Sequence, residues 1–268
     1  MKTGISAASL YPMETESALL HLSDLGYTLF EIFFNSVYEI TPEYCQLLNQ
    51  LQKDYGFQIK SVHPFTSALE SMLLFENYER RTAEGFEFYK RYMEAAKSLG
   101  ADILVLHGQR IGSGSLSDEA YSERYHKLYL LGQTFGITVA QENVRQFRSS
   151  RPEFIQTMRR TLGKECAFVL DVKQALLSGV DSVEMCRIMG EQLVHVHLSD
   201  HTEEYTCLLP GEGNSDFLPL QKALDELGYT GAVITEVYRN AISDDNALCR
   251  SRIFTENVFH SKKSPDFA

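Results

Sequence analysis

Eight short apolar segments, each followed by a helical pattern, recur along the 268-residue sequence. Strands that alternate with helices predict a parallel sheet. Eight such units in a chain of this length predict a closed (β/α)8 TIM barrel, an α/β fold with a single domain. The strands are expected at 2–7, 28–34, 57–63, 102–107, 137–143, 166–171, 194–200 and 232–237. The helices are expected at 15–25, 42–55, 78–99, 117–135, 152–162, 181–189, 217–227 and 244–259. A doubly wound open sheet is the alternative, but residues 7–10 lack the glycine-rich first turn that it normally shows.

Charge and composition limit the partners that the chain is expected to have. The formal net charge is −11, whereas binding a nucleic-acid backbone requires clustered lysine and arginine. No apolar run approaches the length of a membrane span, and no signal sequence is recognisable. Five scattered cysteines without a CxxC motif are typical of reduced thiols. We therefore expect a cytoplasmic protein that binds neither nucleic acid nor membranes.

The expected seventh strand, 194–200, alternates apolar and polar residues. Its apolar side chains, Val194 among them, are expected to contact the helices, while His195 and His197 face the barrel interior. His197 lies near the carboxyl end of the strand, where barrel enzymes have their active sites. We interpret His195 as a hydrogen-bonded core residue.

Ionisable residues lie at or near the carboxyl ends of seven expected strands. Because these ends converge in a barrel, the side chains should meet in one buried site. Buried carboxylates without a partner are costly, so we expect a compensating cation, and three carboxylates with an imidazole suit Mn, Mg, Co or Zn. A salt-bridge cluster is the alternative, but the basic residues noted near these ends are few: Lys60, Arg110 and Arg145. The seven ionisable residues are Glu31, His63, His107, Glu142, Asp171, His197 and Glu236.

Seven short phrases occur in order at barrel spacing: SVHP (61–64), VLHG (105–108), QEN (141–143), VLDVKQA (169–175), VHLSD (196–200), LPGEGNSDF (209–217) and ITEV (234–237). Through them the chain resembles the xylose isomerase-like TIM barrel superfamily, which includes sugar phosphate isomerases and epimerases and relatives of the apurinic endonucleases. The resemblance covers nearly all of residues 1–268. It implies that Glu142, Asp171, His197 and Glu236 hold one divalent metal ion, in agreement with the strand-end argument.

The sequence departs from the patterns of these families at several positions. The family often has Asp-x-x-His after the sixth strand, and Gln174 stands at the histidine position here. Ketose 3-epimerases have a glutamate and an arginine where this chain has Arg148 and Glu203, so sugar recognition of that type is not implied. The endonucleases need an aspartate and a histidine about where Tyr205 and Cys207 stand, which disfavours a three-metal nuclease.

Several further residues are expected to line the site. We expect His63, His107, Gln174 and Glu212 to contact substrate, with hydrogen-bonded packing as the alternative for the two histidines. The phrase 210–213 is either a turn into the next helix or an edge of the active site. Segments 65–77 and 110–118 are candidate lids.

These features together predict a metal-dependent isomerase or epimerase that acts on a small sugar or related polyhydroxy carbonyl compound. Glu142 and Glu236 would transfer protons at carbon, through an enediolate that one divalent ion stabilises. The alternatives are a lyase that dehydrates a keto-polyol, a non-catalytic sugar-binding barrel with a structural metal and, third, a nuclease. The expected partner is a small-molecule sugar, and the sequence leaves homo-oligomerisation open.

Overall fold

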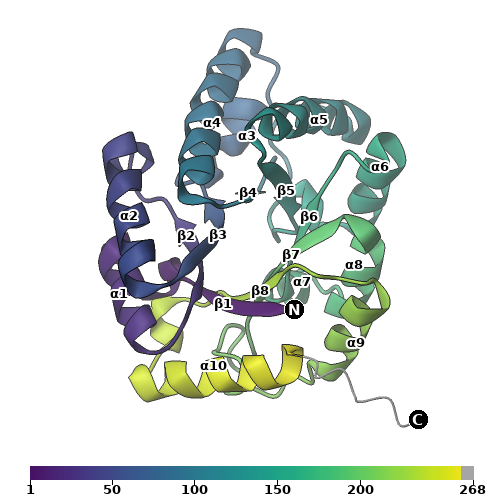
Figure 1. The fold of residues 1–268 in the computed structure, drawn as a ribbon. Helices are drawn as coiled ribbons and strands as arrows, with labels where there is room; N and C mark the ends of the chain where they lie inside the picture. The colour runs from purple at the N-terminus through teal and green to yellow at the C-terminus, as the bar shows by residue number, and fades with distance from the viewer. Residues whose placement is uncertain (261–268) are drawn as a thin grey trace, which may run out of the picture.

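The computed structural model describes residues 1–260, in which eight parallel strands close into a barrel in sequence order (Figure 1). This confirms the predicted (β/α)8 architecture. Every strand except β7 lies inside its predicted segment, and β7 begins one residue before it. The strands are β1 (Lys2–Ser6), β2 (Leu29–Phe33), β3 (Gln58–His63), β4 (Ile103–Leu106), β5 (Thr138–Glu142), β6 (Phe168–Asp171), β7 (Leu193–Leu198) and β8 (Ala232–Thr235).

Helices surround the barrel on all sides (Figure 1). Local signals fix their ends: the Thr41 side chain accepts a hydrogen bond from the N–H of Tyr44, and Gly56 adopts the left-handed conformation after the last turn. Two short helices, α3 (Glu70–Leu74) and α7 (Val172–Leu177), were not predicted. The predicted ones are α1 (Thr15–Asp24), α2 (Pro42–Tyr55), α4 (Glu79–Leu99), α5 (Asp118–Phe135), α6 (Pro152–Leu162), α8 (Ser182–Met189), α9 (Leu218–Glu226) and α10 (Asp245–Phe259).

The interior of the barrel changes from apolar to polar along the strands. Ala140 of β5 and Val169 of β6 belong to an apolar cluster inside the barrel. Two residues further along the same strands are Glu142 and Asp171, which are also buried. Because side chains alternate along a strand, these carboxylates lie on the same inward face, one layer closer to the carboxyl end.

Val194 corrects one prediction about β7. It packs against the apolar cluster inside the barrel instead of against the helices. The cause is an irregularity in the pairing of β6 with β7, where Phe168 pairs with Leu193 but Val169 pairs with His195. Val194 is the extra residue of β7 in this pairing. After it, His195 and His197 face inward, as predicted.

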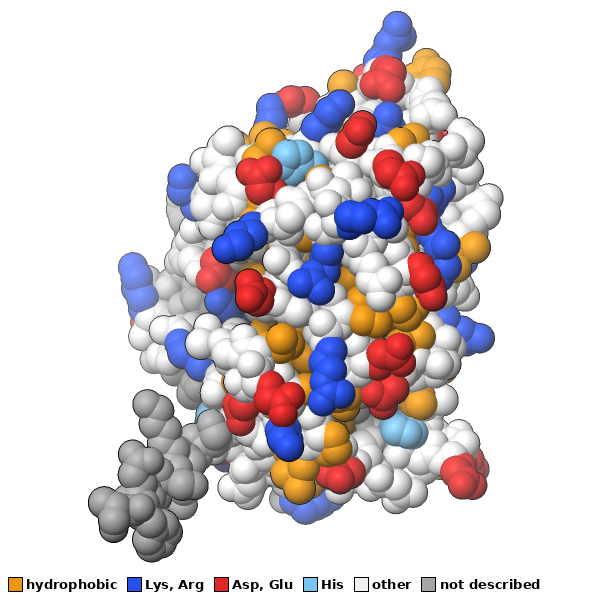
Figure 2. Space-filling view, turned by 90° about the vertical axis from the view of Figure 1, so that its right-hand side faces the viewer, with side chains coloured by type: hydrophobic (Ala, Val, Ile, Leu, Met, Phe, Trp, Pro, Cys, Tyr) orange, Lys and Arg blue, Asp and Glu red, His pale blue; other side chains and the backbone are white. Residues whose placement is uncertain are grey.

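One face of the outer surface has mixed charge. On the face shown in Figure 2, acidic and basic side chains are interspersed among apolar ones. Within residues 1–260, no helix is both long and apolar enough to cross a membrane.

Candidate metal centre

Four ionisable side chains meet at the carboxyl end of the barrel. Glu142 and Asp171 are the last residues of β5 and β6, His197 lies in β7, and Glu236 directly follows β8. Each offers one nitrogen or oxygen atom, and these atoms all lie within 4.8 Å of one another. The structure thus brings together the four residues that the family resemblance implied as ligands of one ion.

The ring of His197 contacts carboxylates through both nitrogens. Nδ1 is 3.0 Å from Oε1 of Glu142 and 3.2 Å from Oε2 of Glu236, while Nε2 is 3.0 Å from Oε2 of Glu31. If Nε2 has the proton and donates it to Glu31, Nδ1 offers its lone pair to the space between the other two carboxylates. A histidine that ligates a metal is typically oriented in this way by a second carboxylate.

Glu31 belongs to a fully buried layer beneath the four residues. Its Oε2 accepts a hydrogen bond from Ser61 Oγ at 2.8 Å and lies 3.3 Å from Nε2 of His195. His195 Nε2 is also 3.1 Å from Ser61 Oγ. His195 therefore has the hydrogen-bonded core role that was predicted. Together, Ser61 and His195 hold the Glu31 carboxylate in position against His197.

The charges of the centre fit a divalent cation. Four carboxylates, those of Glu31, Glu142, Asp171 and Glu236, have 0 to 19% of the side chain exposed. Among the buried side chains of residues 1–260, the only lysine or arginine is Lys173. Burial would lower the pKa of His197, but the surrounding carboxylates outweigh it and raise that pKa well above its usual value, so His197 can add a second positive charge. Two positive charges still do not balance four carboxylates, and oxygen and imidazole ligands suit Mn²⁺, Mg²⁺, Co²⁺ or Zn²⁺.

The pKa values of these carboxyls reflect their different neighbours. Burial would raise the pKa of Glu142, but contacts with His107 and His197 outweigh it and hold that pKa well below its usual value. For Asp171, burial dominates over the attraction to Lys173 and raises the pKa to about 7. For Glu236, attraction to His197 and Lys173 outweighs burial and lowers the pKa to about 2.

Lys173 is the residue of the centre that the sequence analysis missed. Its Nζ lies 3.6 Å from Oδ2 of Asp171 and 3.8 Å from Oε2 of Glu236. Lys60 was one of the basic residues that a salt-bridge cluster could have used. Its Nζ instead lies 2.7 Å from Oδ2 of Asp102, at the opposite end of the barrel. One signal in the sequence could have found it, because Lys173 stands only two residues after Asp171, an expected ligand.

His63 and His107 lie beside Glu142. Their Nε2 atoms are 3.0 Å apart, and Nε2 of His107 is 3.0 Å from Oε2 of Glu142. The two histidines and Glu142 form a second group of possible metal ligands. The side chain of His63 is 2% exposed and stacks on Phe33, whereas that of His107 is 21% exposed. His107 is therefore the one that a small molecule can reach directly.

The other two residues expected to contact substrate have protein partners. The Oε1 atom of Gln174 accepts a hydrogen bond from the backbone N–H of Arg145 at 3.0 Å. Glu212 is exposed, and its carboxylate lies 3.2 Å from Arg250 of α10. Glu212 is outside the groups of possible ligands found in residues 1–260.

The glycine-rich phrase 210–213 wraps around a buried carboxylate. Oδ2 of Asp200 accepts hydrogen bonds from the N–H groups of Gly211 and Gly213, both at 3.0 Å. A Cβ on Gly213 would lie 2.3 Å from Oδ1 of Asp200, so only glycine fits there. The phrase thus has a clear structural role in this loop.

The two segments expected to act as lids are joined to each other. In α3, Glu70 accepts hydrogen bonds from the N–H of Gly108 and from the hydroxyl of Tyr89, and Ser71 Oγ accepts one from the N–H of Arg110. Burial is the main cause that raises the pKa of Glu70 to about 8. Segment 65–77 therefore packs on the loop after β4, directly next to His107.

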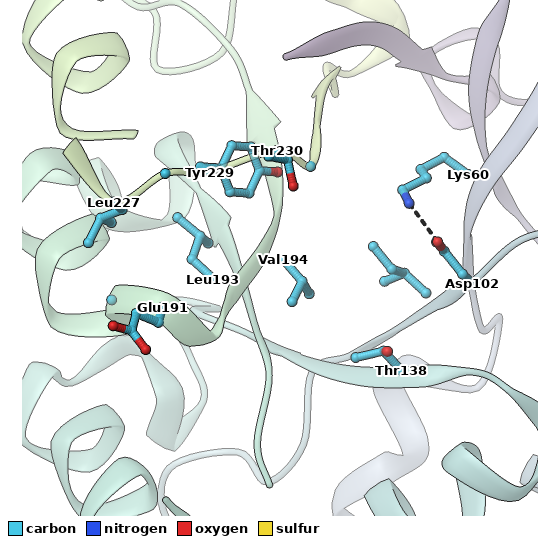
Figure 3. A pocket seen from close by; sticks show the side chains of 13 residues that line it. Lys60, Asp102, Thr138, Glu191, Leu193, Val194, Leu227, Tyr229 and Thr230 are labelled. Carbon is cyan, nitrogen blue, oxygen red and sulfur yellow. Dashed lines mark hydrogen bonds and ion pairs between the residues drawn. The ribbon is translucent and has the colours of Figure 1, made fainter. Parts of the chain in front are cut away.

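A separate pocket of about 380 Å³ lies at the opposite end of the barrel (Figure 3). Its lining includes the Lys60–Asp102 ion pair, Thr138 at the start of β5 and Thr230 just before β8. These positions are at the amino ends of the strands. The pocket is thus distinct from the metal centre.

Comparisons with known proteins agree with this architecture. The family model described as xylose isomerase-like TIM barrel matches residues 19–252. An uncharacterised protein of Mycobacterium leprae is 25% identical over 96% of this chain and 95% of its own length. The fructoselysine 3-epimerase of Escherichia coli O157:H7 is 19% identical over 94% and 96% of the two chains. The crystal structure of a D-tagatose 3-epimerase-like protein superposes with a TM-score of 0.79 at 20% identity, covering 97% of each chain.

Proposed function

Because the chain belongs to the xylose isomerase-like TIM barrel family, we propose that it is a divalent-metal-dependent isomerase or epimerase of a small sugar or sugar-like carbonyl compound. The observation on which this proposal rests is the position of His197 Nδ1, 3.0 Å from Glu142 and 3.2 Å from Glu236, with Asp171 beside them. The names of the E. coli relative and of the structural neighbour, both epimerases or epimerase-like, support the substrate class.

Glu142, Asp171, His197 and Glu236 would hold the ion. When bound, the ion would act as a Lewis acid that stabilises negative charge developing on the substrate's carbonyl oxygen. Asp171 and His197 would mainly anchor the ion, and the proton transfer is assigned to the other two residues. Glu31 keeps the His197 ring in place through its contact with Nε2.

Glu142 and Glu236 would move protons at carbon. In the closed strand order, β5 and β8 are three positions apart, so these carboxylates approach a bound substrate from different sides. The pKa of each is held below its usual value, despite burial, chiefly by His107 and His197 around Glu142 and by His197 and Lys173 near Glu236. Both are therefore ionised at neutral pH. An ionised carboxylate can accept the proton from the carbon next to a carbonyl group and return it to the neighbouring carbon, which isomerises the sugar. Epimerisation would instead require the opposite carboxylate to deliver a proton to the other face of the same carbon, after that carboxylate has itself taken up a proton from solvent.

Recognition of the rest of the substrate would differ from that of the ketose 3-epimerases. Arg148, at the position where those enzymes have a glutamate, donates a hydrogen bond to Asp118 at 2.8 Å and so has a structural partner. Glu203 is exposed and lines a surface groove of about 610 Å³ with Arg145 and His201. His107 is partly exposed beside Glu142 and is therefore our candidate for a hydrogen bond to a substrate oxygen.

The test is a panel of ketoses incubated with the Mn²⁺-loaded protein in D₂O and followed by NMR. We expect turnover of at least one sugar, with deuterium entering at the carbon beside the carbonyl. Glu142→Gln and Glu236→Gln should each lower turnover on the order of 10²-fold or more, a typical contribution of a general base. Glu226→Gln, which removes an exposed carboxylate of α9, is the matched control and should retain full activity.

Three outcomes would contradict parts of the proposal. Full activity and exchange in both variants would show that other groups move the proton. Turnover without deuterium incorporation would indicate a hydride shift and leave the metal centre in place. No turnover across the panel, with metal bound, would favour a non-catalytic barrel.

A further inference from the structure

We infer that Lys173 is a built-in counter-ion of the metal centre, which weakens the binding of the divalent ion and stabilises the site when no ion is bound. The inference rests on the proposed metal centre, but it does not depend on which sugar is the substrate.

Lys173 is a buried cation between two of the proposed ligands. Its side chain is 4% exposed, and Nζ lies 3.6 Å from Oδ2 of Asp171 and 3.8 Å from Oε2 of Glu236. On another side, Nζ lies 4.6 Å from the centre of the Tyr238 ring. Because its nearest charged neighbours are two carboxylates, the amine is a fixed positive charge.

The same two carboxylates would bind the metal and attract the ammonium. A divalent ion held by Asp171 and Glu236 would come within a few ångströms of Nζ, because ligand oxygens lie about 2.0–2.2 Å from such ions. Two cations at this separation repel each other, and the repulsion is hardly screened because both are buried. The ion must therefore bind against the charge of Lys173, or displace its side chain.

When no ion is bound, the charge of Lys173 stabilises the site instead of opposing its occupation. Glu31, Glu142, Asp171 and Glu236 are packed together, and the Lys173 ammonium offsets part of their mutual repulsion. Lys173 should thus narrow the difference in stability between the metal-free and the metal-bound protein. An ordinary structural ion pair would not change metal affinity in this way.

The test compares Lys173→Met with wild type in titrations with Mn²⁺ alone, measured by calorimetry or by competition with a chelator. Methionine preserves much of the buried stem and removes the charge. At pH 8, where proton competition for the carboxylates is reduced, we expect Mn²⁺ to bind at least about tenfold more tightly to the variant. Lys60→Met is the matched control: it also removes one positive charge, but from the Lys60–Asp102 pair at the other end of the barrel. Its affinity for Mn²⁺ should stay within about twofold of wild type.

Thermal unfolding provides a readout that does not depend on the titration. In the presence of a chelator, Lys173→Met should unfold at a lower temperature than wild type. Saturating Mn²⁺ should raise its unfolding temperature by more than it raises that of wild type, because a tighter ligand stabilises the folded state more. Lys173→Gln, a smaller polar and neutral replacement, serves if the methionine variant fails to fold.

Unchanged or weaker Mn²⁺ binding in the neutral variants would overturn the inference. Failure of both the wild type and the variants to bind Mn²⁺ would overturn it together with the metal centre. If the variants bind Mn²⁺ more tightly but no sugar is turned over, the proposed catalytic function fails and the role of Lys173 stands.

Discussion

Glu70 should make the stability of the barrel depend on pH. It is fully buried in α3, and burial is the main cause that raises its pKa from 4.5 to about 8. For an acid whose pKa is raised on folding, the folded state binds the proton more tightly. Its stabilising contribution is complete below about pH 4.5 and is lost as the pH rises through 8. At 1.36 kcal/mol per pH unit, the loss is on the order of 5 kcal/mol.

The variant Glu70→Gln removes this ionisation and preserves the shape of the side chain. The amide oxygen can still accept the N–H of Gly108, and its NH₂ group can donate to the Tyr89 hydroxyl oxygen. Compared with wild type, the variant should gain stability as the pH rises from 5 to 9. For a chain of this size the gain in unfolding temperature should reach on the order of 10 °C.

The assay is thermal unfolding of both metal-free proteins, followed by circular dichroism across this pH range. Other titrating groups are common to the two proteins, so they cancel in the difference. Glu43→Gln, which removes an exposed carboxylate from α2, should give a curve parallel to wild type. If the Glu70→Gln curve is also parallel, burial does not raise the pKa of Glu70 and the reasoning is wrong.

Two further predictions concern the proposed metal centre directly. The double variant Asp171→Asn, His197→Ala should fold but lose its metal, and stoichiometric metal in elemental analysis would place the site elsewhere. Glu31→Gln should weaken Mn²⁺ binding about 10- to 100-fold, because an outer carboxylate orients the His197 ring. Titration calorimetry measures this change, and an unaltered affinity would show that Glu31 has no part in orienting the ligand.

The barrel and the convergence of its strand ends could be predicted from sequence because both follow from simple periodicities. Alternating strands and helices determine the architecture, and the last inward position of each strand then points to the same place. Glu142 and Asp171 lie within one residue of the expected ends of their strands, so their convergence could be predicted from the pattern, whereas the choice of four ligands came from the family resemblance. Helix ends with local signals, such as Gly56 after α2, were equally accessible.

The remaining features depend on contacts that the sequence pattern does not specify. Lys173 is buried because α7 starts directly after β6 and turns it back onto Asp171 and Glu236. The path of the loop that contains Glu212 depends on Asp200, which binds backbone N–H groups from several points of that loop. Such tertiary contacts override local conformational preferences. The pattern of a single sequence does not show them.

The order of the strands around the barrel also determines when the proposed metal centre could form during protein synthesis. The ring closes only when β8 pairs with β1, which joins Lys2 to Ala232. Glu236 follows that last strand, so a nascent chain still lacks one of the four proposed ligands after seven strands have left the ribosome. Pairing of strands so distant in sequence costs more loop-closure entropy than pairing of neighbouring strands. Metal uptake should therefore follow closure of the barrel, and the ion would secure a fold that the apolar core has already assembled.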